Sequence, residues 1–167
     1  MEAQSLLKVE QLRVELGPRD KPLRPVDGIS FEVSAGRTLA LVGESGCGKS
    51  MTALACMGLL PAGGRIADGS IMLGDEALHT MPETQMRDVR GNRLAMIFQE
   101  PATSLNPVLT VGRQIGEALA RHRGLSGAAA HARALELVSA VGIADAERRL
   151  GEYPFQLSGG MKQRVMI

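Results

Sequence analysis

The chain has 167 residues, of which 44% are apolar and 22% charged, and its formal net charge is +1. This composition is typical of one soluble globular domain and excludes the disordered and fibrous classes. A near-neutral charge, with one Tyr, three Phe and no Trp, excludes a nucleic-acid binder that relies on a basic stripe or on base stacking. The longest apolar run, residues 53–62, falls short of the roughly 20 residues of a membrane-spanning helix. Cys47 and Cys56 favour reduced thiols in the cytosol over a disulfide framework.

The first part of the chain predicts β structure around one strand–loop–helix unit. The expected strands are residues 7–16, 26–33, 38–42, 70–73 and 94–98, and the expected helices are residues 49–60 and 82–90. The runs at 38–42 and 94–98 are short and continuously apolar, which predicts strands that are buried on both faces.

The second part of the chain predicts helices separated by glycines. Their expected ranges are 110–123, 126–141 and 145–150, followed by a helix that begins near Ser158. No stop signal precedes Ile167 within this last helix, so we expect the sequence to be part of a longer protein.

Residues 43–50 (GESGCGKS) match the phosphate-binding pattern GxxxxGK[ST]. Glycines let the backbone curl so that successive N–H groups point at one anion, and a following helix adds the positive end of its dipole. We expect Lys49 to reach the β- and γ-phosphates of a nucleotide and the Ser50 hydroxyl to bind Mg²⁺. The expected nucleotide-binding residues are Gly43, Glu44, Ser45, Gly46, Cys47, Gly48, Lys49, Ser50 and Met51. The alternative, a chance match in a glycine turn, is disfavoured by the strand predicted before the loop and the helix predicted after it.

Several residues in this part of the chain are interpreted as structural. Cys47 is a small filler in the loop, although its position predicts that alkylation blocks nucleotide binding. The sequence at 71–76 (IMLGDE) imitates an apolar strand ending in Asp-Glu, but Gly74 interrupts it and predicts a hairpin turn with solvated carboxylates. His79, His122 and His131 are expected on the surface or on helix faces.

A second glycine element lies at residues 157–164 (LSGGMKQR). Ser158 is a suitable helix N-cap, and the two glycines after it leave backbone donors uncovered at the start of a helix. This arrangement is a second candidate anion site, although a lone SGG is most simply explained as a helix cap.

Taken together, these segments resemble the ATP-binding-cassette (ABC) ATPases. Residues 43–50 resemble the Walker A loop of that family, Gln99 in IFQEP resembles its Q-loop, and residues 157–164 resemble its signature motif. The stretches 98–112 and 153–167 are similar to the branch that serves dipeptide, oligopeptide, glutathione and nickel importers.

The resemblance implies an α/β fold of the P-loop NTPase class, ABC ATPase type, with an N-terminal antiparallel β subdomain and a helical subdomain, truncated before the Walker B strand. Within this single, incomplete domain, residues 1–98 form the β subdomain and P-loop core, residues 99–156 the Q-loop and helical subdomain, and residues 157–167 the signature and the start of its helix.

The resemblance also implies a mechanism in which two cassettes close head to tail over two ATP molecules. The signature residues Leu157, Ser158, Gly159, Gly160 and Met161 then meet the ATP on the partner's loop. Lys49 and Gln99 have catalytic roles, and Ser50 and Gln99 hold Mg²⁺.

The implied function is that of the ATP-binding subunit of an importer for peptides or related solutes, an ATPase as the full-length protein. The implied partners are a second cassette, a membrane permease and, indirectly, an external solute-binding protein, with no nucleic acid. The implied location is the cytoplasmic face of the cell membrane, where the subunit is peripheral.

The chain departs from the family pattern at Leu16, where an aromatic residue usually stacks on adenine, which leaves Val26 and its loop for aliphatic contact. The Walker B strand and switch histidine follow the signature in the family, so we expect no ATPase activity from this chain by itself and an under-paired sheet around residues 38–42. A soluble cassette ATPase acting on nucleic acid or ribosomes is the main alternative, but no coiled-coil insertion, zinc cysteines or basic linker lies between Gln99 and Leu157. A P-loop kinase or GTPase has no use for the SGG element.

Overall fold

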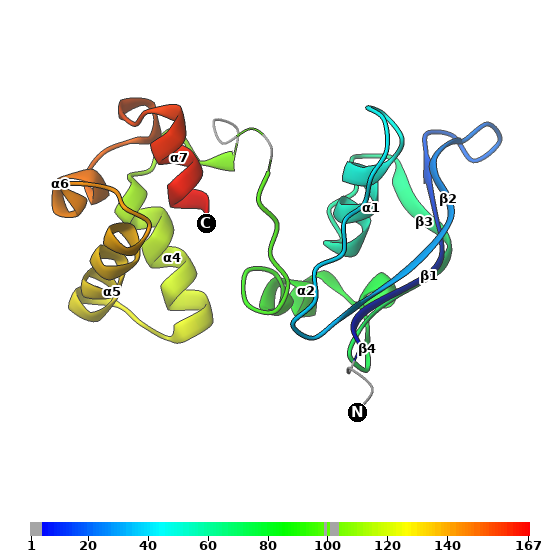
Figure 1. The fold of residues 1–167 in the computed structure, drawn as a ribbon, viewed down its shortest axis with the longest axis horizontal. Coiled ribbons are helices and arrows are strands. Elements are labelled where there is room, and N and C mark those ends of the chain that lie inside the picture. Colours follow the sequence, from blue (N-terminus) through cyan, green and yellow to red (C-terminus); the bar gives the residue numbers. More distant parts are fainter. Residues whose placement is uncertain (1–4, 99, 101–103) are drawn as a thin grey trace. The chain divides into compact units, whose positions relative to one another are not determined.

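The computed structural model describes residues 5–98, 100 and 104–167. The chain forms two compact units, Met1–Arg90 and Gly91–Ile167, which are described separately (Figure 1). The first unit ends at Arg90. The functional segments expected from the sequence, residues 1–98, 99–156 and 157–167, remain a prediction.

The first unit is built on a four-stranded antiparallel sheet. Its strands are β1 (Ser5–Leu16), β2 (Leu23–Ser34), β3 (Gly64–Leu73) and β4 (Glu76–Ala77), in the order β2-β1-β3-β4. The predicted antiparallel β subdomain is therefore confirmed, and the third strand begins six residues earlier than residue 70. The two-residue loop before Glu76 confirms the predicted hairpin turn, because Leu73 pairs with Glu76.

A β-bulge at Gln11 keeps the apolar residues of β1 on one face. Gln11 has a φ of 47°, and the register shifts between Val9 and Leu12. Because side chains alternate along a strand, residues three positions apart share a face only across such a bulge. Val9 and Leu12 are accordingly 1% and 0% exposed. Ser30 Oγ fixes the bulge by accepting a hydrogen bond from the Gln11 backbone N–H at 2.8 Å.

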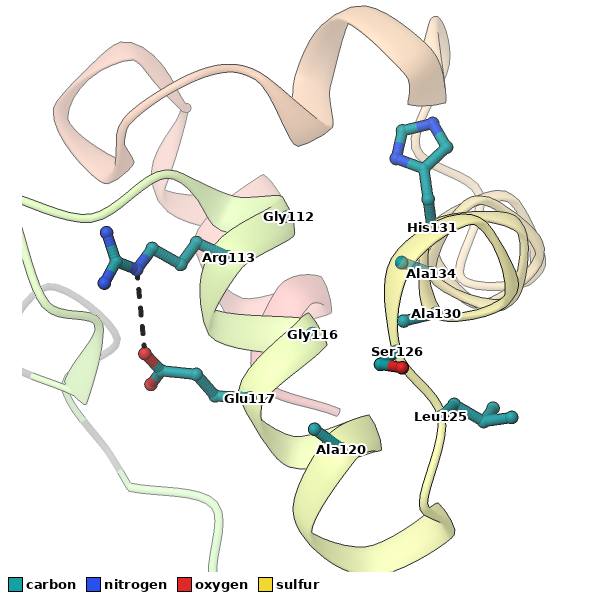
Figure 2. A pocket seen from close by; sticks show the side chains of 11 residues that line it. Gly112, Arg113, Gly116, Glu117, Ala120, Leu125, Ser126, Ala130, His131 and Ala134 are labelled. Carbon is teal, nitrogen blue, oxygen red and sulfur yellow. Dashed lines mark ion pairs between the residues drawn. The ribbon is translucent and has the colours of Figure 1, made fainter.

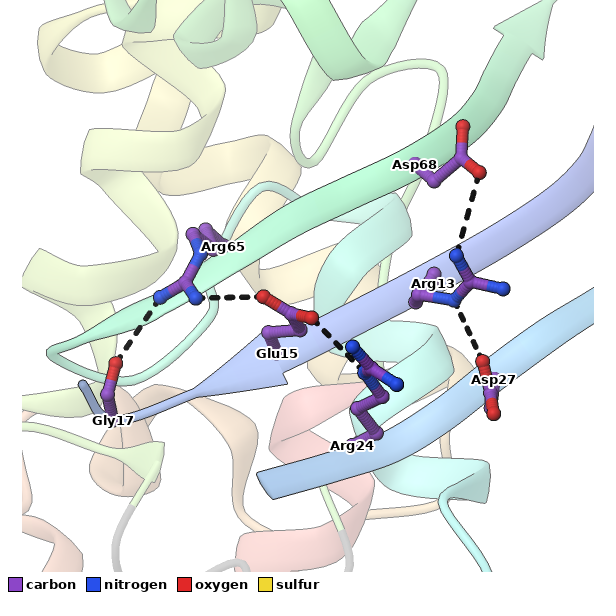
Figure 3. A network of polar contacts seen from close by, with 7 residues as sticks. All are labelled: Arg13, Glu15, Gly17, Arg24, Asp27, Arg65 and Asp68. Atoms are coloured by element: carbon purple, nitrogen blue, oxygen red, sulfur yellow. Dashed lines mark hydrogen bonds and ion pairs between the residues drawn. The ribbon is translucent and has the colours of Figure 1, made fainter. Parts of the chain in front are cut away.

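Charged side chains link β1 to both of its neighbours (Figure 3). Glu15 accepts hydrogen bonds from Arg24 Nε of β2 at 3.0 Å and from Arg65 Nη2 of β3 at 2.6 Å. Arg65 also donates to the Gly17 carbonyl at 3.1 Å. The hydrogen bond from Arg24, together with Arg65, lowers the pKa of the Glu15 carboxyl against the opposing effect of burial. The carboxylate is thus kept ionised between two guanidinium groups.

Helix α1 (Lys49–Cys56) follows the glycine loop and is shorter than the predicted range 49–60. Gly58 ends it with a φ of +61°. The Gly58 N–H donates to Ala55 O at 3.0 Å and the Leu59 N–H donates to Leu54 O at 2.9 Å. This pair of bonds is a Schellman motif, in which a left-handed glycine ends the helix before any proline is reached. After β4 come the 3₁₀ turn η1 (Leu78–Thr80) and helix α2 (Glu83–Val89).

The predicted strands at 38–42 and 94–98 are wrong for this structure. Apart from an isolated bridge at Leu94, neither run pairs with any strand in the part of the chain that the structure describes. Val42 is 92% exposed and Ile97 is 55% exposed. A strand buried on both faces needs strands beside it and layers above and below it, and neither run finds them here. The aliphatic surface around residues 38–42 is exposed, as expected, but the run forms no strand and so is not an under-paired part of the sheet.

The second unit is helical, as predicted. Its elements are α4 (Val111–Arg123), α5 (Gly127–Ala140), α6 (Ala146–Leu150), η2 (Pro154–Gln156) and α7 (Gly159–Met166). Their buried core consists of Val111, Leu119, Ala130, Ala134, Val138, Ile143, Leu150 and Leu157. Within the described ranges, no helix has the length and apolar character needed to cross a bilayer.

Candidate functional site

Gly48 joins the glycine loop to α1 in a conformation that only glycine adopts without strain. It is the N-cap of α1, with a φ of 92° and a ψ of 0°. A Cβ at this position would collide with the Pro25 carbonyl oxygen and lie 3.3 Å from Val26 Cγ2. The start of β2 therefore lies directly against the loop, and the second glycine of the pattern is required by both torsion and space.

The first turn of α1 presents backbone donors. The first regular bond of the helix runs from the Thr52 N–H to Gly48 O at 2.8 Å, so the N–H groups of Lys49, Ser50 and Met51 have no acceptor within the helix. Glycine has no side chain to cap them, and Ser50 is exposed. This end of α1 is suited to bind an anion.

The Lys49 ammonium lies inside the curl of the loop. Its Nζ donates to Gly43 O at 2.8 Å and to Glu44 O at 2.6 Å, and it lies 3.3 Å from Cys47 Sγ. The backbone thus closes around a positive charge, beside the uncovered donors of α1. A phosphate group fits this combination, since it takes hydrogen bonds from the N–H groups and a charge-assisted one from Lys49.

The second glycine element has the predicted cap. Ser158 is the N-cap of α7, and its Oγ accepts a hydrogen bond from the Met161 N–H at 3.3 Å. Ser158, Gly159 and Gly160 are exposed, and a Cβ on either glycine would meet no atom within 4 Å. Leu157 is 6% exposed and belongs to the core of the second unit. The core thus holds the segment in place while its serine and glycines face outward.

The structure brings the predicted nucleotide-binding residues 43–51 together in the first unit and the signature residues 157–161 together in the second. Gln99 lies outside the described residues. Among those that are described, no group of three or more His, Cys, Asp or Glu side chains is placed to hold a metal ion. Ser50 is the remaining candidate ligand for Mg²⁺, at the position where the loop meets the helix.

The expected aliphatic contact of Val26 with a base does not fit its surroundings. Val26 is 5% exposed and packs beneath Gly48, so it supports the loop and offers almost no surface. Leu16 is half-buried at the end of β1, where its Cδ2 would lie 3.0 Å from a Cβ on Gly64. The sequence did not predict that the Pro25 carbonyl packs against Gly48. The GxxxxGK[ST] pattern does not show which strand lies next to the loop.

A groove in the second unit lies between α4 and α5 (Figure 2). Its volume is about 370 Å³, and small residues, among them Gly116 and Ala134, form its walls. His131 and the ion pair between Arg113 and Glu117 also line it. Of the site residues predicted from the sequence, those that the structure describes all lie outside this groove. His131 Nε2 lies 3.1 Å from Glu147 Oε1, which agrees with the interpretation of His131 as a surface histidine.

Comparison with known sequences identifies the family. The family described as ABC transporter matches residues 26–167, which include both glycine elements. The chain belongs to the ABC transporter family. It is 51% identical over 164 residues to the oligopeptide transport ATP-binding protein AppD of Bacillus subtilis, covering 98% of this chain and 50% of that protein. It is 46% identical over 163 residues to the dipeptide transport ATP-binding protein DppD of Escherichia coli, again covering 98% and 50%. The chain thus spans about half the length of these curated relatives.

A solved structure shows the same fold as this ABC transporter chain. It is the dimeric post-hydrolysis structure of the ATP-binding cassette MJ0796 bound to ADP and Pi, which superposes with a TM-score of 0.80 at 22% identity. The match covers 96% of this chain and 66% of that one. The expected fold class, an ABC ATPase with an antiparallel β subdomain and helices, is therefore confirmed.

Proposed function

We propose that this chain is the ATP-binding part of a subunit that drives a peptide-type ABC importer. The observation that carries the proposal is the loop at residues 43–50, where Lys49 lies beside three N–H groups that have no acceptor in the helix. The curated relatives are named as transport proteins for oligopeptides and dipeptides, which favours peptides or related solutes over nucleic acid or ribosomes.

In this proposal residues 43–51 bind the phosphates of ATP. The backbone N–H groups of α1 and the Lys49 ammonium hold the negative charge, and the exposed Ser50 hydroxyl is a ligand for Mg²⁺ together with Gln99. Mg²⁺ supplies charge neutralisation of the phosphates when bound. Lys49 stabilises the charge of the transferred phosphoryl group, since a fixed ammonium in the loop needs little reorganisation during the reaction.

We infer that the second anion site acts on a different molecule of ATP. Ser158, Gly159 and Gly160 present an exposed helix start, and they grip ATP held by the loop of a second cassette. Binding energy at this shared site is converted into closure of two subunits, because each contributes half of the contacts. The closure is transmitted to a membrane permease, which places the subunit at the cytoplasmic face of the membrane; solute reaches the permease through an external binding protein.

The first test is ATP binding by a Lys49→Ala variant. Loss of a charge-assisted hydrogen bond to phosphate is expected to raise the Kd for ATP about 10- to 100-fold. Isothermal titration with ATP and Mg²⁺ measures this change. Lys21→Ala is the matched control, because Lys21 is exposed in the loop between β1 and β2. Full affinity in the Lys49→Ala variant contradicts the proposal.

A further inference from the structure

The side chain of Arg90 contacts the C-terminal end of α1. Its Nε donates to Met57 O at 2.6 Å, and its Nη2 donates to Gly58 O at 3.0 Å. Met57 is the C-cap of α1, so these carbonyls lie at the negative end of the helix dipole. The guanidinium is therefore both a hydrogen-bond donor and a favourable charge at this end. Only 16% of the Arg90 side chain is exposed.

Arg90 is itself fixed by α2. Its Nη1 donates to Glu83 Oε1 at 2.8 Å, and its backbone N–H donates to Met86 O at 2.9 Å. At Gly58 a Cβ would come 3.0 Å from Arg90 Nη2 and 3.4 Å from Met86 Cε. Gly58 thus ends α1 and also leaves room for the guanidinium. These contacts join α1 to a segment more than 30 residues later in the chain.

The opposite end of α1 carries the donors of the candidate phosphate site. A helix of eight residues is only about 12 Å long, and its regular hydrogen bonds make it move as one body. A shift of Met57 is therefore carried to the N–H groups of Lys49 and Ser50. We propose that Arg90 is a positioning residue for nucleotide binding, which fixes the carbonyl end of α1 and thereby sets the place of its phosphate-facing end. This inference rests on the proposed function.

Arg87 provides a matched control on the same helix. Its Nε also pairs with Glu83 Oε1, at 3.5 Å, but 65% of its side chain is exposed. Among the contacts of the described residues, Arg87 donates to no carbonyl of α1. Arg87→Gln and Arg90→Gln therefore both remove a positive charge near Glu83. Only Arg90→Gln also removes the hydrogen bonds to the carbonyl end of α1.

The experiment compares ATP binding to the whole chain by isothermal titration in the presence of Mg²⁺. Arg90→Gln is expected to raise the Kd about five-fold at unchanged stoichiometry, while Arg87→Gln binds as the wild type does. Glu83→Gln keeps Arg90 but removes the carboxylate that orients it, and we expect a rise of about two-fold. Because Glu83 is 58% exposed, this variant tests the idea even where Arg90→Gln does not fold.

Three results overturn the inference. Wild-type affinity in Arg90→Gln does so, as does an equal loss of affinity in Arg87→Gln. A fall in stoichiometry at constant Kd also does so, because it shows that Arg90 only stabilises the folded state.

Hydrogen exchange of α1 without nucleotide separates this inference from the proposed function. If the wild type binds no ATP, the proposed function fails on its own. Faster exchange of residues 49–56 in Arg90→Gln than in Arg87→Gln then still shows that Arg90 fixes the helix, and equal exchange overturns that claim.

Discussion

The two thiols of the chain differ in accessibility and in chemistry. Cys47 is exposed in the glycine loop, with its Sγ 3.3 Å from Lys49 Nζ. Cys56 lies at the end of α1 and is 5% exposed. Burial raises the pKa of the Cys56 thiol to about 11, because the charged thiolate loses its hydration. At neutral pH Cys56 therefore stays protonated and unreactive.

Iodoacetamide is expected to modify Cys47 alone near neutral pH, and saturating ATP with Mg²⁺ is expected to slow the reaction about ten-fold. The reason is steric, since a phosphate held beside Lys49 covers the adjacent sulfur. Mass spectrometry of tryptic peptides measures the rate at each cysteine. A Cys47→Ser variant is the control and takes up no label in the folded state. Equal labelling with and without ATP removes the support for phosphate binding in this loop.

At the scale of an element, β1 is linked to both of its neighbours through Glu15. The pKa of Glu15 is lowered in the folded state, chiefly by the hydrogen bond from Arg24, and its ordinary value is 4.5. A carboxyl group whose pKa is lower in the folded state than in the unfolded state stabilises the fold. This contribution is fully present above the pKa of the unfolded state and is lost as the pH falls through the pKa of the folded state. The sheet is therefore expected to lose this contribution below about pH 4.5.

The Glu15→Gln variant tests this linkage. It is expected to be less stable than the wild type at pH 7, and the difference is expected to shrink as the pH is lowered toward about 3. Urea unfolding at a series of pH values measures the free energy. Glu10→Gln serves as the control, because Glu10 is 52% exposed and pairs with Lys8 on the same strand. A stability difference that does not change with pH contradicts the assignment.

At the scale of the whole molecule, the chain divides into two compact units, Met1–Arg90 and Gly91–Ile167. The core of the second unit includes Leu157 and Leu119, and the residues of the candidate phosphate site lie in the first unit. We expect the two units to unfold separately, so that a change that destabilises the core of one unit leaves the other folded.

Leu157→Ala is expected to destabilise the second unit by about 2–5 kcal/mol, through lost burial and a cavity. Hydrogen exchange rates, measured separately for residues 111–166 and residues 5–90, show the effect on each unit. Val9→Ala, in the core of the sheet, is the converse control. In this variant the hydrogen exchange rates are expected to rise in the first unit. Equal acceleration in both units after Leu157→Ala shows one cooperative unit instead.

Much of the candidate site follows from the sequence, because its elements are defined by neighbouring residues. The GxxxxGK[ST] pattern predicts a loop followed by a helix, and Gly48 has the left-handed torsion that this turn requires. The cap at Ser158 is equally local, since its Oγ meets the N–H of a residue three positions later. The role of Gly58 was also within reach of the sequence, since a glycine near the end of a helix is a stop signal.

The sequence by itself determined the turns, caps and alternating strands of this ABC transporter chain, because each depends on torsions and hydrogen bonds among residues a few positions apart. Tertiary structure decided three other features. Residues 38–42 are exposed because no strand of the described sheet lies beside them. The Pro25 carbonyl packs against Gly48, and Arg90 donates hydrogen bonds to the carbonyls of Met57 and Gly58. Such contacts join residues far apart in the chain, and they form only where packing brings the two partners together.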